Sequence, residues 1–342
     1  MAATGLRAAS ARRGERRATR RSGVLALGVL VVVALLARIA GSGTVPWLQT
    51  FSIVFGSLVV SALPFVAIGA VAAAAISVFV PISAIERIGR LPRPLQLPAA
   101  GLAGIAFPIC ECGSVPVARR MMLRGLPPGA AITFMLAAPI VNPVVIVSTF
   151  VAYQGRGPVL SMVAGRFALG LVTAIAVGWV LGGRRVDAVL RPRPDDGPEP
   201  IEVETPEARW RSFFVHAADD FAFMAKYLLI GATVAAMVQT FLPQGLIAGL
   251  AAVPILDAIA LMAFAAILSL CSESDAFIAA SLGGFGFGPS SQLAFLVFGP
   301  MVDIKLAAIY TGAFRRATVR AIVLTSAAVT LVGVLWLRVV IG

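Results

Sequence analysis

The sequence predicts an all-α polytopic membrane protein with two inverted repeats, each containing three spanning helices and a re-entrant helical hairpin, plus an extra N-terminal helix. Three observations support this fold class. Hydrophobic residues make up 59% of the 342 residues and charged residues only 13%, with a mean hydropathy of +0.95, so long apolar runs must lie in a bilayer. The other two observations are an internal duplication and the distribution of positive charge.

The duplication appears when the chain is shifted by 161 residues, which aligns two stretches without a gap. Polar and helix-breaking residues keep this register: Cys110 falls on Cys271, Gly125 on Gly286, Pro139 on Pro300 and Asn142 on Asp303. Joint recurrence of a cysteine, a kink proline and a polar residue is typical of transporters built from structural repeats. The sequence therefore predicts two copies of one membrane unit.

The N-terminus is basic and precedes an apolar run. Seven arginines lie between Arg7 and Arg21, and the apolar run begins at Val24. Because no clear small-residue cleavage site follows this run, we interpret residues 23–41 as a retained transmembrane helix rather than a signal peptide. Residues 1–22 are then an Arg-rich arm in the cytoplasm.

Repeat 1 is expected over residues 51–183 and repeat 2 over residues 213–342. A helix kinked near Pro64 lies within 41–85, and later spans are expected near 129–153, 158–182, 213–241, 290–313 and 319–340. Between the repeats, residues 184–212 contain Arg-Pro-Arg-Pro-Asp-Asp-Gly-Pro-Glu-Pro, a composition typical of a mobile linker. We place this linker in the cytoplasm.

Residues 95–128 and 246–288, which carry the cysteines, do not fit single crossings. With single crossings, basic residues in 119–124 and 184–211 would lie outside, against the Lys/Arg bias of cytoplasmic loops. If each segment enters and returns on one side, 22 of the 28 Lys and Arg lie inside. The others are Arg38, Arg156 and Arg338 outside, and Arg166, Lys226 and Lys305 within spans.

The lengths of the helices in these segments agree with hairpins. Residues 97–109 and 115–125 would form helices of about 15–20 Å, roughly half of a ~30 Å hydrocarbon core. A repeat with three spans and one hairpin inverts the copy that follows it, so the second hairpin would enter from outside. Such inverted repeats are the basis of alternating access in many transporters.

Both hairpin tips are polar. The first reads Cys110-Glu111-Cys112-Gly113-Ser114-Val115-Pro116, where Ser114 is expected to cap a new helix. The second reads Cys271-Ser272-Glu273-Ser274-Asp275-Ala276-Phe277, where Ser272 and Asp275 have capping-box spacing. Each tip would direct a helix N-terminus to the middle of the membrane, where it favours an anionic group or a thiolate.

The acidic residues at these positions indicate a solute site, because an ionised side chain at the bilayer centre costs at least about 2.5–3.5 kcal/mol. A single cysteine is more often a packing residue, and Lys305 could form a structural ion pair instead, although residues i and i+2 such as Asp303 and Lys305 do not face each other on a helix. We expect no catalytic residue and no metal site. The expected substrate-binding residues are Cys110, Glu111, Cys112, Asn142, Cys271, Glu273, Asp275 and Asp303, and the expected coupling residues are Glu273, Asp275, Asp303 and Lys305.

Together with Ala138-Pro139-Ile140-Val141-Asn142-Pro143, the two tip motifs resemble the predicted-permease family that includes the organoarsenical efflux permease ArsP. The resemblance extends from about residue 51 to residue 340. It implies a multi-pass permease of the bacterial plasma (inner) membrane, and some relatives export trivalent organoarsenicals.

Soft thiolate ligands prefer soft centres, so the tips are compatible with a thiophilic solute. The chain has no phosphate-binding loop of the type Gly-x-x-x-x-Gly-Lys-Ser/Thr, and proton antiport is therefore favoured over ATP-driven export. The alternatives are a channel-like conduit for a metal ion or small metabolite and, less favoured without a histidine partner for a cysteine, an intramembrane enzyme. The expected partners are membrane lipid and a small-molecule solute; we expect no cofactor and, despite the net charge of +12, no nucleic acid, and the oligomeric state stays open.

Overall fold

The computed structural model describes residues 46–79, 89, 91–106, 109–155, 159–192, 206–241 and 255–341. The expected N-terminal arm and first helix, residues 1–22 and 23–41, lie outside these ranges. Within them the fold is helical and contains no strand, and the only extended pairing there is the isolated bridge between Leu190 and Phe314. The predicted all-α class is confirmed.

The helices of the first half of the chain are α2 (Pro46–Phe79), α4 (Arg93–Leu102), the 3-10 helix η1 (Ala103–Ala106), α5 (Glu111–Leu123), α6 (Pro128–Val141), α7 (Pro143–Tyr153) and α8 (Val159–Leu181). The short helix α9 (Val186–Val189) follows. The second half contains α10 (Pro206–Phe241), α11 (Leu256–Leu268), α12 (Asp275–Leu282), the 3-10 helix η4 (Gly283–Phe285), α13 (Pro289–Phe298), α14 (Ile304–Ala313) and α15 (Arg316–Ile341).

Helix bounds in the two halves follow the 161-residue offset seen in the sequence. Helices α6 and α13 begin at the duplicated residues Pro128 and Pro289. The residues that precede them also match, because Gly125 and Gly286 have φ angles of 96° and 89°. Glycine adopts this left-handed conformation without a steric cost, which explains why both copies end a short helix with it.

Five helical stretches among the described residues are long and apolar enough to cross a membrane: Pro46–Phe79, Pro128–Tyr153, Val159–Leu181, Arg209–Phe241 and Arg316–Val339. They coincide with five of the expected spans. The expected span 290–313 is divided into α13 and α14, neither of which is long enough alone. Helix α2 contains Pro64 and continues through it over 34 residues, a length of about 50 Å at 1.5 Å per residue.

The two cysteine-containing segments form pairs of short helices. Helices α4 and α5 have 10 and 13 residues, and α11 and α12 have 13 and 8. At 1.5 Å per residue these are about 12–20 Å long, which is too short to cross a hydrocarbon core. The first pair begins earlier than the expected half-helices 97–109 and 115–125, and Ile109 and Cys110, which directly precede α5, are not helical.

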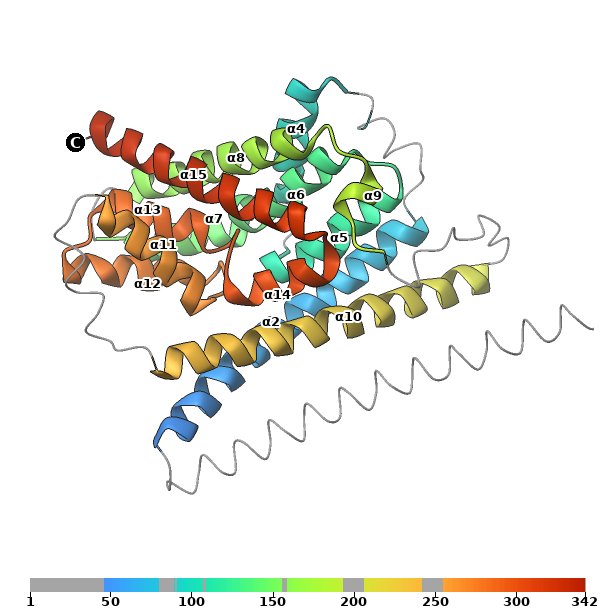
Figure 1. Ribbon diagram of the computed structural model, residues 1–342, viewed down its shortest axis with the longest axis horizontal. Coiled ribbons are helices and arrows are strands. Elements are labelled where there is room, and N and C mark those ends of the chain that lie inside the picture. Colours follow the sequence, from blue (N-terminus) through green and yellow to red (C-terminus); the bar gives the residue numbers. More distant parts are fainter. Residues whose placement is uncertain are drawn as a thin grey trace, which may run out of the picture.

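The long helices enclose the short ones. Helices α2 and α10 pack along each other, and α8 packs against α15. In Figure 1 these two pairs lie at the bottom and the top of the molecule, with α5, α7, α12 and α14 between them. This arrangement places the tips of both short-helix pairs in the interior.

Candidate functional site

The tips of the two short-helix pairs meet at Glu111 and Ser272. Ser272 Oγ donates a hydrogen bond to Glu111 Oε2 over 3.0 Å, and both side chains are buried. The two residues are 161 positions apart, so this bond joins duplicated positions of the two halves. The halves therefore contact each other through equivalent points.

Lys305 of α14 is fully buried beside these tips. Its Nζ lies 3.1 Å from Glu111 Oε1 and 3.8 Å from Asp303 Oδ2. The expectation that Asp303 and Lys305 could not face each other was wrong, because Asp303 precedes the helix in an extended conformation and its side chain is not part of the helical spacing. A buried cation needs such partners to offset its lost hydration.

Polar side chains cap the helices that restart after each break. Asn142 Oδ1 accepts a hydrogen bond from the backbone N–H of Val144 over 2.9 Å, and Asp303 Oδ1 accepts one from the backbone N–H of Leu306. These duplicated positions therefore share the same structural role at the starts of α7 and α14. The second oxygen of Asp303, Oδ2, has no hydrogen-bond partner.

A second buried cation, Arg166 of α8, joins the site. One of its terminal nitrogens (Nη2) donates to Asp275 Oδ2 over 2.8 Å and to the backbone oxygen of Ser272 over 3.1 Å. The other (Nη1) donates to Thr149 Oγ1 over 2.8 Å. The sequence predicts Arg166 within a span but does not assign it to the site. The available signal was its isolation in the apolar run 159–181, since a charge at that depth requires a partner.

The expected caps at the tips were wrong. Helix α5 begins at Glu111 with Cys110 as its N-cap residue, and Ser114 Oγ instead donates to the backbone oxygen of Glu111 inside the helix. Ser272 and Asp275 form no capping box, because their side chains bind Glu111 and Arg166. A buried carboxylate or guanidinium is costlier to leave unpaired than a backbone N–H, so the ionic contacts take precedence.

All three cysteines are free thiols at the tips. Cys110 and Cys112 are buried, whereas Cys271 is partly exposed. Among the described residues, no group of three or more His, Cys, Asp or Glu is arranged to hold a metal ion. The first tip thus carries two buried thiols and the second tip carries one partly exposed thiol.

Carboxyl groups outnumber cations around the tips. Glu111, Asp275 and Asp303 are buried and Glu273 is partly buried, while the paired cations are Lys305 and Arg166. Four buried atoms of this set have no hydrogen-bond partner: Arg166 Nε, Glu273 Oε2, Asp275 Oδ1 and Asp303 Oδ2. Because unpaired buried polar atoms are rare and costly, this arrangement favours the uptake of protons or of a polar ligand.

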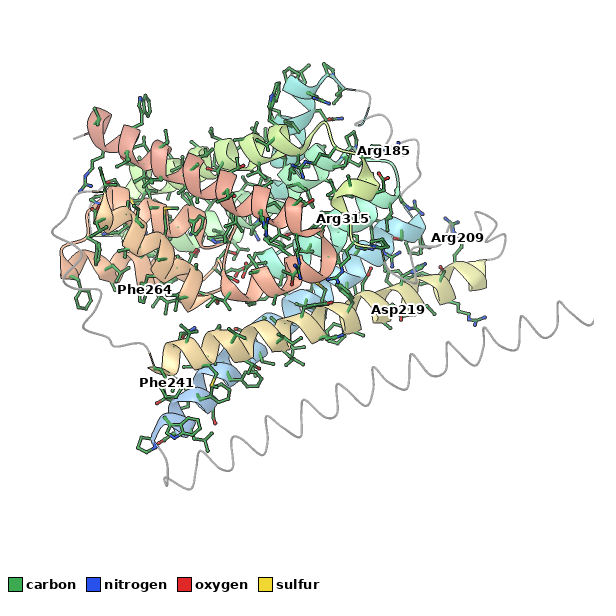
Figure 2. The ribbon with its side chains drawn as sticks, in the orientation of Figure 1. Arg185, Arg209, Asp219, Phe241, Phe264 and Arg315 are labelled. Atoms are coloured by element: carbon green, nitrogen blue, oxygen red, sulfur yellow. The ribbon has the colours of Figure 1, made fainter. Side chains whose placement is uncertain are left out.

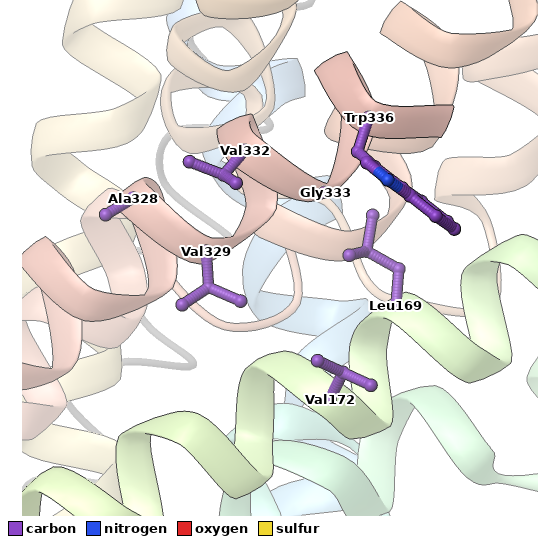
Figure 3. A pocket seen from close by; sticks show the side chains of 7 residues that line it. All are labelled: Leu169, Val172, Ala328, Val329, Val332, Gly333 and Trp336. Carbon is purple, nitrogen blue, oxygen red and sulfur yellow. The ribbon is translucent and has the colours of Figure 1, made fainter. Parts of the chain in front are cut away.

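An apolar pocket of about 390 Å³ lies elsewhere, between α8 and α15. Figure 3 shows its lining residues: Leu169, Val172, Ala328, Val329, Val332, Gly333 and Trp336. None of the expected site residues lines this pocket. The indole nitrogen of Trp336 is the one side-chain polar atom among these lining residues, so the pocket suits a hydrocarbon chain better than a polar solute, and the buried ionic cluster at the tips remains the candidate site.

Known proteins resemble the chain over most of its length. A family model described as "Predicted permease" (ArsP_1) matches residues 47–337, from α2 to α15. The UPF0718 protein YcgR of Bacillus subtilis (strain 168) is 37% identical over 263 residues, which cover 77% of this chain and 88% of that protein. A Streptococcus mutans protein named "Putative two-component membrane permease complex subunit" is 31% identical over 284 residues, 82% of this chain and 92% of its own. No solved structure matches. With five apolar helices of spanning length and this family match, the chain is a multi-pass membrane protein that belongs to the predicted-permease family.

Proposed function

We propose that the chain is a secondary transporter of the bacterial plasma membrane that exports a small thiophilic solute, such as a trivalent organoarsenical, by proton antiport. One observation carries this proposal: the duplicated positions Glu111 and Ser272 meet in a buried ionic cluster with Lys305. Maintaining such a cluster between two halves of a membrane protein is costly, and intramembrane ionisable groups are typical of solute and proton pathways.

The thiols give the proposed substrate class. Cys110 and Cys112 lie on one tip and Cys271 on the other, so a soft centre bound between the tips has thiol ligands on both sides. Export requires that these bonds exchange. Two thiols would bind a monosubstituted trivalent arsenical dihydroxide with release of two waters, and hydrolysis of the two As–S bonds by two waters would return both thiols and release the solute, without an oxidant or reductant.

The expected test is uptake into everted membrane vesicles with a panel of organoarsenicals, metal ions and small metabolites. Replacing Cys110 or Cys271 by serine should lower uptake of a trivalent organoarsenical without lowering the amount of protein in the membrane, because a hydroxyl is a poor ligand for a soft centre. Cys112→Ser should act in the same direction. Full uptake by the triple serine variant would refute thiol binding and leave the permease itself unaffected. Uphill uptake that responds to a pH gradient would exclude a channel-like conduit.

We also propose that the two repeats are inverted in the membrane, with α4 and α5 entering from the cytoplasm and α11 and α12 from outside. Arg119, Arg120 and Arg124 end the first short-helix pair, and Figure 2 shows Arg185, Arg209 and Arg315 gathered at one end of the molecule. Positive charge at one end supports a cytoplasmic location of that end.

Labelling in intact cells tests this topology. With a membrane-impermeant maleimide, Arg185→Cys and positions 119–124 should stay unlabelled, whereas Gln154→Cys should be labelled. Arg185 and Gln154 are both exposed at helix ends, so they form a matched pair that differs in the proposed side. Gln244 is also expected outside, although it falls beyond the described residues. Labelling within 184–212 from outside would exclude the inverted arrangement.

We propose, as a second form of the working transporter, a complex with a second subunit, because the Streptococcus relative is named as a subunit of a two-component complex. Uptake by vesicles in which this chain is the single added protein tests whether it transports alone. Activity only after addition of a second membrane protein would assign the chain to such a complex.

A further inference from the structure

The two halves of the chain match in sequence but differ in packing. Helix α2 lies so close to α5 that a Cβ atom at Gly69 would collide with the backbone of Gly113. The equivalent positions, 161 residues later, are Ile230 on α10 and Ser274 before α12. Ile230 is 50% exposed and Ser274 is exposed, so the α2–α5 contact has no counterpart in the other half.

Helices α14 and α7, which are equivalent in the two halves, also differ in whether another helix covers them. On α14, Lys305 and Gly312 contact α10, where Gly231 touches the backbone of Lys305 and Tyr227 covers Gly312. The equivalent residues on α7 are Val144 and Val151, and they are 53% and 47% exposed. Helices α2 and α10 therefore cover α5 and α14 but leave the equivalent faces of α12 and α7 uncovered.

The solvent exposure of the two tips differs in the same way as the helix packing. Cys110 and Cys112 on the first tip are buried, whereas the equivalent Cys271 and Glu273 are partly exposed. One turn further, Pro116 and Val117 are buried, whereas their counterparts Phe277 and Ile278 are 50% and 38% exposed. The ionic cluster is thus closed on the α5 and α14 side and more accessible on the α12 and α7 side.

We infer that α2 and α10 move as a pair between two sets of surfaces: in the described state they cover α5 and α14, and in a second state they cover α12 and α7. The inference rests on the proposed transport function and specifies its conformational change. In the second state, Ile230 would lie beside Ser274 as Gly69 now lies beside Gly113, but at a wider separation because isoleucine and serine have side chains. Val66 would lie beside Val151 as Tyr227 now lies beside Gly312.

Two physical reasons support this exchange. Helices α2 and α10 pack along each other over much of their length, so they can move as one body. The surfaces that the pair would gain stand at the duplicated positions of those that it would lose, and they carry exposed apolar residues, Val144, Val151 and Ile278, whose burial would offset the contacts given up. Two packings of similar free energy are the condition for two populated states. Moving the pair would uncover the first tip and cover the second, which exchanges access to the cluster.

Cross-linking tests the second state directly. In a Cys110→Ser/Cys112→Ser/Cys271→Ser background, Tyr227→Cys/Gly312→Cys reports the described state, and Ile230→Cys/Ser274→Cys reports the second one. Both residues of the second pair are exposed, so their replacement should not disturb the described packing. Val60→Cys/Val332→Cys is a control, because both residues are exposed on α2 and α15, which lie on opposite sides of the molecule.

With a short thiol cross-linker in native membranes, both reporting pairs should become linked and the control pair should not. The second pair should accumulate with time even if its state is populated at only about 0.1–10%, since linking traps each molecule that visits it. Complete linking of the first pair, with the second pair no higher than the control, would overturn the inference. Vesicle uptake is measured separately, in the chain that keeps Cys110, Cys112 and Cys271, because the serine background is itself expected to lower uptake. Transport by that chain without linking of the second pair refutes the movement alone, whereas linking without transport by that chain refutes the proposed function alone.

Discussion

Replacing Lys305 by methionine is expected to destabilise the folded protein by about 3–5 kcal/mol and to abolish transport. Lys305 is fully buried and is the cation nearest to Glu111, at 3.1 Å, with Asp303 at 3.8 Å. Its removal leaves two buried carboxyl groups without a compensating charge, which costs more than the intact ion pair contributes. Thermal unfolding of purified protein and the amount of protein in the membrane measure the loss.

Two controls separate this ion pair from general effects of the substitution. Lys226→Met removes a lysine from the same membrane-spanning region, but Lys226 is exposed on α10 and should tolerate the change. Adding Glu111→Gln to Lys305→Met should restore much of the lost stability, because it removes the unpaired charge while Gln can still accept the hydrogen bond from Ser272. If Lys305→Met unfolded at the wild-type temperature, the ionic cluster would not hold the two halves together.

The composition of the site could be predicted from the sequence, but its pairings could not. Glu111 and Lys305 stand out because charges in apolar sequence are costly. The duplication shows that Glu111 and Ser272 are equivalent, yet equivalence along the chain does not show that two residues touch. That contact depends on the three-dimensional meeting of the tips, which no local pattern encodes.

The partner of Arg166 could not be predicted from the sequence either. Its charge within α8 required a partner, but Asp275 is 109 positions away and the sequence offered several other carboxyl groups. The predicted helix caps at the two tips were wrong for a related reason. A capping motif predicts that a serine or aspartate side chain accepts a hydrogen bond from a nearby backbone N–H. In this interior, a charged group that is distant in the sequence binds the same side chain more strongly.

The difference between the two halves could not be predicted either. A duplicated sequence predicts two equivalent environments, and the matching helix bounds agree with that expectation. The described structure nevertheless buries Val117 and exposes its counterpart Ile278. Helices α2 and α10 form a single pair, and in the inferred movement this pair covers either α5 and α14 or α12 and α7. One structure therefore contains one of these two arrangements.

The excess of carboxyl groups over cations at the tips indicates how proton binding could be coupled to transport. Of the unpartnered acidic oxygens, Oδ2 of Asp303 lies nearest to Lys305, at 3.8 Å, and forms no hydrogen bond. Protonating that oxygen would free Lys305 from one of its two charged neighbours. A proton bound there would thus change the electrostatic balance between the tips, which is the property that an antiporter requires of its coupling residue.

Asp303→Asn is therefore expected to abolish uphill export driven by a pH gradient while leaving solute exchange between the two sides of the membrane intact. The change is conservative for the fold. Asparagine ranks with aspartate as an N-cap residue, and Asn142 already caps α7 at the equivalent position. Proton-driven uptake and solute exchange in everted vesicles measure the two activities separately.

Asp303→Ala provides the matched structural control, since it removes both the cap and the carboxyl group. Loss of the cap costs about 1 kcal/mol, so Asp303→Ala should unfold at a lower temperature than Asp303→Asn although both lack proton-driven uptake. If Asp303→Asn still pumped against a gradient at the wild-type rate, Asp303 would serve only as the cap of α14 and a partner of Lys305. The proton would then have to be carried by Glu273 or Asp275, each of which also has a buried oxygen without a hydrogen-bond partner.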